Sequence, residues 1–532
     1  MTRKMRLRPR FSSFPVAERG HTAALIGRSP LMAALAAILV GLAGGAVVAF
    51  APFWLGFAAL AALAAVYAIL VDTRVGLATV IGIATIVPFA TLPFRAVITP
   101  TLLTLALAAL MGVWILRMLV RGDQRVTITP IGMALIGFLG ITLFAFLLGS
   151  NASPGPSLLH NYVKFTMATL FFFSVVNCVR DRQTARWVFR FLIIGAALSA
   201  VIALVLYVIP DRLALQILVS FGRIGYPVEG RVLRYVEDDP NGLMRAIGLS
   251  VDPNSFGGML ALIGVLATTQ LVSERPTLPR RMLLIATGVI LLALFLTYSR
   301  AALGGMIVAA MYVATLRYQR LWWVILAAGA LAAVLFIGLG VGERFVERIV
   351  EGVQFRDRAN QIRLAEYQNA IAIIQAYPVF GIGFGQAPEI DLVAGVSSIY
   401  LAIAQRTGLV GLTAFLGIMI WFFVRNWRAL RAASADGDEE RVAWLVSLQA
   451  ALAAALAVGL LDHYFFNIEF SHMSALLWGT IGLAVAIEEM GVEGCMWKVE
   501  GCRLNIQPST FNVQPSTHNN TYVAADNREA YL

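Results

Sequence analysis

The chain has 532 residues, of which 59% are hydrophobic and only 13% are charged. Soluble domains carry roughly 25% charged residues. A chain this poor in charge cannot cover a surface that faces water, so we expect lipid to surround most of it. The net charge of +11 comes almost entirely from arginine, because the chain has only three lysines. In a membrane protein such charge usually reports topology, so we expect no nucleic-acid partner.

Apolar segments long enough to cross a bilayer as helices follow one another along most of the chain. Such a crossing takes about 20 residues. We therefore predict an all-α, polytopic membrane helical bundle with about 14 transmembrane helices. The segments are residues 31–50, 52–71, 75–93, 98–119, 130–149, 163–179, 187–209, 254–273, 282–298, 301–316, 321–341, 398–424, 442–460 and 471–488.

The arginines in the short loops predict the orientation. With a cytoplasmic N-terminus, every inside loop carries at least one arginine and the short outside loops carry almost none, as the positive-inside bias requires. We predict a multi-pass protein of the cytoplasmic (inner) membrane with both termini in the cytoplasm. Residues 1–30 form a basic cytoplasmic tail, 31–490 the transmembrane helical domain and 491–532 a disordered cytoplasmic tail. Two larger loops, 210–253 and 342–397, lie outside.

The first outside loop has mixed charge, which is typical of a solvated loop. Near its end, Asp252-Pro253-Asn254 predicts a helix start, because proline suits the first turn and aspartate can cap it. Capping explains these three residues without a function. It does not explain Arg245, which is a candidate anion contact, since guanidinium forms paired hydrogen bonds to phosphate oxygens.

The second outside loop is expected to contain an amphipathic helix on the outer membrane surface. Tyr367, Ala370, Ile371 and Ile374 recur at helical spacing. Arg363 lies beside this stripe, either as a solubilising charge or as an anion contact. Pro378 ends the helix, and the glycines at 381, 383 and 385 read as a tight turn. A nucleotide-binding glycine loop is disfavoured because it lacks the required strand and helix.

Further candidate residues stand at the ends of predicted spans. Arg300 lies at the tip of the 282–316 hairpin, either as a snorkelling anchor at the interface or as an anion contact. Asp462, His463 and His472 flank the last outside loop. Each histidine is either an ordinary hydrogen-bonded residue or a general base, which requires an imidazole with a near-neutral pKa.

Three stretches together resemble the O-antigen ligase and O-antigen polymerase family of membrane glycosyltransferases. They begin with Thr297-Tyr-Ser-Arg300-Ala-Ala-Leu-Gly304. The second is Arg363…Tyr367…Pro378-Val-Phe-Gly-Ile-Gly-Phe-Gly385, and the third is Tyr400-Leu…Thr407-Gly-Leu-Val-Gly411. Arg245 with Pro253-Asn254 matches a weaker upstream pattern. The similarity covers roughly 240–425, where the order and spacing of the motifs match the family.

The resemblance implies the chemistry and the partners. A glycan linked to a lipid diphosphate is the donor, a hydroxyl of a glycan or lipid is the acceptor, and transfer occurs at the outer face without metal or other cofactor. Arg245, Arg300 and Arg363 would stabilise the departing diphosphate. Many ligases carry a His-Asn pair where this chain has Ser397 and Ser398. The base is then expected to be His463, helped by Asp462, or a carboxylate such as Asp391.

Two other functions fit the same residues. A transporter or flippase of lipid-linked sugars would use the same arginines to hold a diphosphate, although no inverted repeat is evident. A catalytically inactive scaffold of an envelope assembly is favoured by the serine that replaces the family histidine.

Overall fold

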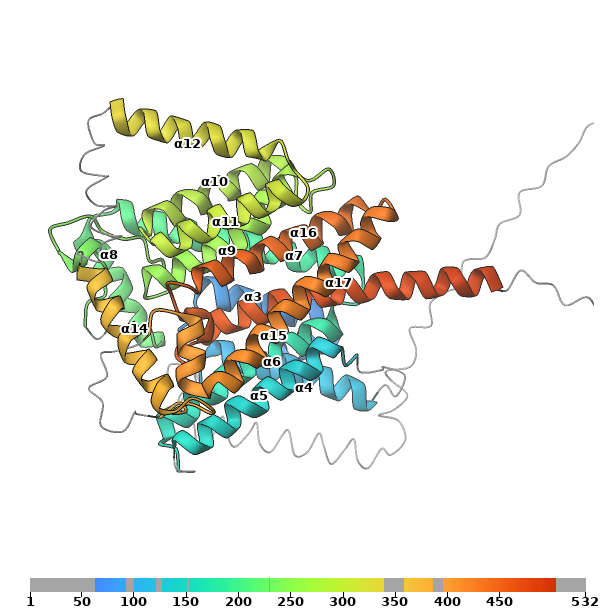
Figure 1. The fold of residues 1–532 in the computed structure, drawn as a ribbon, viewed down its shortest axis with the longest axis horizontal. Coiled ribbons are helices and arrows are strands. Elements are labelled where there is room, and N and C mark those ends of the chain that lie inside the picture. The colour runs from blue at the N-terminus through green and yellow to red at the C-terminus, as the bar shows by residue number, and fades with distance from the viewer. Residues whose placement is uncertain are drawn as a thin grey trace, which may run out of the picture.

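The structure is a computed structural model, and it describes residues 63–91, 100–120, 127–150, 153–228, 230–338, 358–385 and 396–503. In these ranges the fold is all-helical, with two isolated β-bridges as its only strand-like pairings (Figure 1). The helices are α3 (Thr73–Ile86), α4 (Leu102–Val120), α5 (Pro130–Gly149), α6 (Pro156–Cys178), α7 (Arg182–Val208), α8 (Asp211–Ser220), α9 (Pro253–Val272), α10 (Arg280–Leu296), α11 (Arg300–Leu316), α12 (Leu321–Gly338), α14 (Arg358–Ala376), α15 (Ile399–Ala435), α16 (Glu439–Val458) and α17 (Ser471–Arg503), with short 3₁₀ helices at Phe221–Ile224, Val236–Asp238 and Tyr464–Phe466.

The predicted all-α membrane class is confirmed. Seven helices of the described ranges are long and apolar enough to cross a membrane, namely α4, α5, α7, α9, α15, α16 and α17. Helices α3, α11 and α12 are shorter apolar helices. The count of about 14 stays a prediction, because 1–62, 92–99, 339–357, 386–395 and 504–532 lie outside the described residues.

Local sequence signals set several helix starts where they were expected. Asp252 caps α9 by accepting hydrogen bonds from the backbone N–H of Asn254 (2.8 Å) and Ser255 (3.0 Å). Ser299 caps α11 in the same way.

At the other end of the chain, α17 continues to Arg503. The predicted boundary at 491 is therefore not a helix end.

Three helices form the centre of the bundle. In α9, α16 and α17, 83% of the residues of the membrane-length window are buried, compared with 28–44% in the other four long helices. A helix that is apolar all round and buried by its neighbours belongs to the core of a bundle. The other long helices expose one face, which is the face available to lipid.

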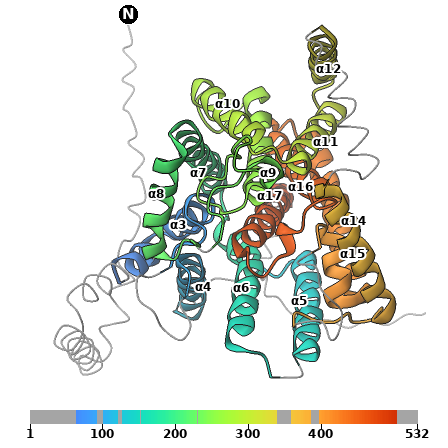
Figure 2. The same ribbon diagram turned by 90° about the vertical axis from the view of Figure 1, so that its left-hand side faces the viewer.

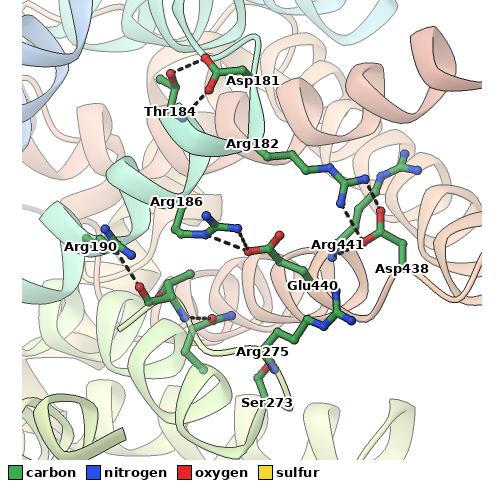
Figure 3. Close-up of polar contacts among 12 residues, drawn as sticks. Asp181, Arg182, Thr184, Arg186, Arg190, Ser273, Arg275, Asp438, Glu440 and Arg441 are labelled. Atoms are coloured by element: carbon green, nitrogen blue, oxygen red, sulfur yellow. Dashed lines mark hydrogen bonds and ion pairs between the residues drawn. The ribbon is translucent and has the colours of Figure 1, made fainter. Parts of the chain in front are cut away.

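One end of the bundle is tied by arginine–carboxylate pairs between helix ends (Figure 3). Arg182 donates to Asp438 (3.1 and 2.5 Å), and Arg186 donates to Glu440 (2.9 and 2.5 Å), which joins the start of α7 to the start of α16. Paired guanidinium–carboxylate contacts of this kind add geometric specificity. We call this the arginine end, and the sequence predicts that it is cytoplasmic.

The opposite end, called the site end below, holds the larger loops. Helix α14 packs beside α15 there (Figure 2). The predicted helix in the second loop is confirmed, but the buried face differs from the expected stripe. Ile371 is 47% exposed, whereas Glu366, Ala370 and Ile373 are buried. The face of α14 that packs against the bundle thus includes a charged residue. The apolar pattern alone therefore predicted a different set of buried positions from the one observed.

The loop 210–253 is more ordered than its mixed charge suggests. Helix α8 and the residues after it close a small apolar cluster against the end of α7, built around Leu206, Leu218 and Tyr226. This cluster fixes the segment that carries Arg245 on the bundle.

Candidate functional site

A buried carboxyl group lies at the centre of the site end. Asp462 follows α16 and is 4% exposed. One of its oxygens, Oδ1, lies 3.8 Å from Nη2 of Arg363 on α14. The other oxygen, Oδ2, is buried and has no hydrogen-bond partner among the described residues. A buried polar atom without a partner is costly, so its presence points to a ligand or a chemical role.

The surroundings of Asp462 make it a weak acid. Burial raises the pKa of Asp462 from 3.8 to about 7, although Arg363 and Arg245 lower it, and Asp252 and Glu366 raise it further. A carboxyl group with this pKa can accept a proton at neutral pH and release it again.

Arg245 joins two segments at this point. Its Nε donates to the backbone carbonyl of Thr297 (2.8 Å), and its Nη2 donates to Oδ1 of Asn254 (2.6 Å). Burial lowers the pKa of Arg245, while Asp252 and Asp462 raise it. One guanidinium thus connects the start of α9 with the α10–α11 turn and still faces the carboxyl groups.

The backbone is strained on both sides of this contact. Val251 (φ 68°) precedes Asp252, and Tyr298 (φ 52°) follows Thr297. A β-branched residue with positive φ is an outlier, and each such residue costs about 1–3 kcal/mol. Strain of this kind persists where the surrounding structure fixes the geometry, as it does at functional sites.

The position that holds a histidine in many ligases belongs to a separate hydrogen-bond cluster. Ser397 donates through its backbone N–H (3.0 Å) and its Oγ (2.6 Å) to Oε2 of Glu366. The hydroxyl of Tyr367 donates to the backbone carbonyl of Ser397 (2.9 Å) and lies 3.1 Å from that of Leu460. This cluster links α14, the start of α15 and the loop that carries Asp462.

His463 is poorly suited to accept a proton. It stacks on Tyr464 with 4.8 Å between ring centroids. Burial and the charge of Arg406 lower the pKa of His463 to about 4. Its Nδ1 is buried and has no hydrogen-bond partner in the described part of the chain. His472 is 1% exposed and lies 3.4 Å from the hydroxyl of Ser255, inside the bundle.

The three predicted arginines do not share one environment. Arg245 and Arg363 both lie near Asp462, whereas Arg300 is exposed at the first turn of α11, three residues after the carbonyl that Arg245 contacts. Sequence reasoning missed Arg234, whose carbonyl accepts from Arg245 N–H (2.8 Å) and whose Nε is buried with no hydrogen-bond partner among the described residues. Its position in a loop of mixed charge gave no signal.

Sequence reasoning also assigned no chemical role to Glu366 and treated Asp252 only as a helix cap. The three-residue spacing from Arg363 to Glu366 was the available signal, since it places both charges on one helix face. Asp391 lies outside the described residues. Within the described ranges, no group of three or more His, Cys, Asp or Glu side chains could hold a metal ion.

The glycine turn after α14 is a packing element. Ile382 and Gly383 donate to the backbone carbonyls of Gln405 and Arg406 (both 2.9 Å), and Leu409 donates to that of Pro378 (2.8 Å). A Cβ at Gly383 (φ 74°) would collide with the end of α5. The turn therefore lies against Gly408, the residue at which α15 is interrupted, and has no room to hold a phosphate.

The family comparison covers part of the segments that form the site end. The O-antigen ligase family matches residues 282–416, which run from α10 through α14 into α15. Arg300 and Arg363 lie inside the match, and Arg245 and Asp462 lie outside it. No curated protein matches the chain. The resemblance seen in the motifs is thus confirmed: residues 282–416 match the O-antigen ligase family, in a chain with seven described helices that are long and apolar enough to cross a membrane.

Proposed function

We propose that the chain transfers a glycan from a lipid-diphosphate donor to an acceptor hydroxyl at the outer face of the cytoplasmic membrane, in cell-surface polysaccharide synthesis. The observation that carries this proposal is the buried Asp462 carboxyl group, which lies 3.8 Å from Arg363, is influenced by the charge of Arg245 and has one unsatisfied oxygen. The ligase family match supports the reaction class.

Asp462 is assigned as the general base. The acceptor hydroxyl gives its proton to Oδ2 of Asp462 as its oxygen bonds to the anomeric carbon of the donor sugar. The bond from that carbon to the diphosphate oxygen breaks, and its electron pair leaves with the diphosphate. A base of pKa about 7 suits this step at neutral pH, whereas an imidazole of pKa about 4 holds a proton poorly.

Arg245, Arg363 and Arg234 are assigned to the developing charge of the diphosphate. Guanidinium groups form paired hydrogen bonds to phosphate oxygens. Their preorganisation near the site lets them stabilise charge that grows in the transition state. Arg300 remains a predicted donor contact at the entrance, because its side chain is exposed.

The ties at the arginine end favour transfer over transport. Arg182–Asp438 and Arg186–Glu440 join helices that a transporter would have to separate for the opposite side to open (Figure 3). Exposed ion pairs are individually weak, so a direct test is needed. Cysteines replacing Arg182 and Asp438, joined by a short bifunctional thiol reagent, should leave glycan transfer intact and would abolish transport.

The central experiment uses the purified protein in lipid nanodiscs. A polyprenyl-diphosphate-linked oligosaccharide and a set of glycan and lipid acceptors are added, and released polyprenyl diphosphate and extended acceptor are measured together. Equal amounts of both products support transfer. Release without an extended acceptor would indicate hydrolysis, and the absence of both products with every donor and acceptor would reject the transferase assignment.

A further inference from the structure

Two cationic side chains lie in segments that are predicted to cross the membrane, outside the groups described above. Lys164 lies on α6, about two turns after the helix begins, and Arg406 lies on the first segment of α15. Both side chains are half-buried. Neither one forms a hydrogen bond or an ion pair with any described residue. An ionisable residue inside a membrane is costly, so such a residue usually marks a functional site.

An aromatic ring, rather than a carboxylate, holds Arg406. Its guanidinium carbon lies 5.4 Å from the centroid of the Phe384 ring. That ring packs against Tyr162 and Phe165 of α6, with 5.3 and 6.2 Å between centroids. Contact with a ring face uses none of the N–H groups of a guanidinium, so Arg406 keeps its donors. The same rings join the part of α6 that carries Lys164 to the segment of α15 that carries Arg406.

One carboxylate is close to both cations but neutralises only part of their charge. Glu469 lies just before α17, which packs along α6 (Figure 2). It is exposed and interacts electrostatically with Lys164 and with Arg406. It forms no ion pair with either of them in the described part of the chain. Since one negative charge cannot balance two positive charges, the group keeps a net positive charge, which attracts anions.

The two cations lie beside the segment that carries the candidate base. The ring of Phe384, which holds Arg406, lies 6.1 Å between centroids from the ring of Phe466. Phe466 ends the short 3₁₀ helix that follows His463. The charge of Arg406 also reaches His463, the chain neighbour of Asp462. An anion bound by Arg406 would therefore lie near the buried carboxyl group.

We propose that Lys164 and Arg406 bind an anionic group of the acceptor, a carboxylate or a phosphate, and thereby select acidic acceptors, an inference that rests on the proposed function. Arg245 and Arg363 are already assigned to the diphosphate of the donor. The acceptor hydroxyl has to reach Asp462, so an anion site beside that residue suits the acceptor. A guanidinium fork and an ammonium group both form strong, charge-assisted hydrogen bonds to carboxylate and phosphate oxygens.

A purely structural role for these cations predicts a different effect on stability. Lys164→Met keeps the length of the side chain and removes a charge without a partner, so it should leave the melting temperature unchanged or raise it. A cation that holds the fold together would lower the melting temperature when it is removed. Arg428→Gln is the matched control, because Arg428 is exposed on the same helix as Arg406 but lies toward the arginine end.

The binding test uses the full-length protein in nanodiscs with glucose, glucuronate and glucose 6-phosphate, which share one sugar ring and differ in the anionic group. At least one of the two anionic probes should raise the melting temperature of wild type and of Arg428→Gln, and glucose should not, because a ligand that binds only the folded state stabilises it. Lys164→Met and Arg406→Gln should bind that probe about tenfold to a hundredfold more weakly. Glu469→Gln should bind it more tightly, because it removes the competing carboxylate.

The transfer test uses acceptor oligosaccharides that end in the same three sugars. Wild type should prefer an acidic acceptor by at least about tenfold in kcat/KM, and Lys164→Met should lose this preference. Equal use of neutral and acidic acceptors by wild type overturns the inference, as does a preference that follows an acidic sugar in the donor instead of the acceptor.

The two tests separate this inference from the proposed function. A melting shift with an anionic probe that depends on Lys164 and Arg406 supports the anion site even if no donor is turned over. Glycan transfer without any such shift supports the proposed function and overturns the inference. A shift that all variants show equally is a general salt effect, and the inference then fails.

Discussion

Replacing Asp462 by asparagine should change stability and activity in opposite directions. The substitution Asp462→Asn keeps the size of the side chain and removes its charge. In the folded protein, burial raises the pKa of Asp462 from 3.8 to about 7. The Asp462 carboxyl group therefore stays protonated in the folded protein over a range of pH in which it is already ionised in the unfolded chain.

The magnitude follows from this difference in pKa. Roughly three pKa units at 1.36 kcal/mol each give a cost of about 4 kcal/mol for burying the ionised group. The cost is absent below pH 4, grows as the pH rises toward 7, and is complete above the folded-state pKa of about 7. The Asp462→Asn variant avoids it. The gain in stability of this variant is smaller than the full cost of about 4 kcal/mol, because a buried amide without a partner also costs free energy.

We therefore expect Asp462→Asn to melt at a higher temperature than wild type at pH 8 and at a similar temperature near pH 4. Glycan transfer by wild type should rise as the pH rises through about 7, as Asp462 loses its proton. Without the base, transfer at pH 8 should fall by about 10²–10⁴-fold.

The assay is thermal unfolding in nanodiscs between pH 4 and 9, together with initial rates of lipid diphosphate release. Asp438→Asn is the control, because Asp438 pairs with the exposed Arg182 at the arginine end, and asparagine still caps α16. It should leave the activity unchanged. A variant at Asp462 that is fully active, or that is less stable than wild type at pH 8, would refute the assignment of a buried base.

The remaining predictions concern other residues of the site end. His463→Gln should lower turnover by less than about tenfold, since a base of depressed pKa contributes little, and a loss of 10²-fold or more in kinetic assays would transfer the base role to His463. Arg245→Lys should lower kcat/KM more than Arg300→Lys does, because lysine cannot make the paired contacts of Arg245; equal losses would place Arg300 in the same site. The orientation is tested with single cysteines at Gln368 and Ser434, both exposed, in a chain without its native cysteines. An impermeant thiol reagent should label only position 368 in intact cells. Labelling at position 434 would overturn the predicted topology.

The regular parts of the molecule follow from local rules and could be predicted. Apolar length and capping residues place α5, α9 and α11 within two residues of their observed bounds. These signals depend only on residues that are close in the chain, so a single sequence contains them. The end of α14 was predictable in the same way, from Pro378 and the glycines that follow it.

The site was predictable only in part, because it depends on contacts between distant segments. Arg363 and Asp462 are about a hundred residues apart in sequence, and only the folded chain shows the 3.8 Å between them. The choice between Asp462 and His463 as base depends on burial, which sequence does not give for adjacent residues in one loop. Arg234 and Glu366 acquire their significance from the same three-dimensional neighbourhood.

The break in α15 at Gly408 fixes a length as well as a direction. With φ 69° and ψ −174°, Gly408 interrupts the helix and leaves residues 399–407 as a short segment held at both ends. Ile399 N–H donates to the carbonyl of Gly459 (2.9 Å) and the Tyr400 hydroxyl to that of Leu456 (2.9 Å). One residue inserted here would turn the start of the segment by about 100°. The number of residues in this segment should therefore be fixed, because an insertion would turn Ile399 and Tyr400 away from the two carbonyls that they contact.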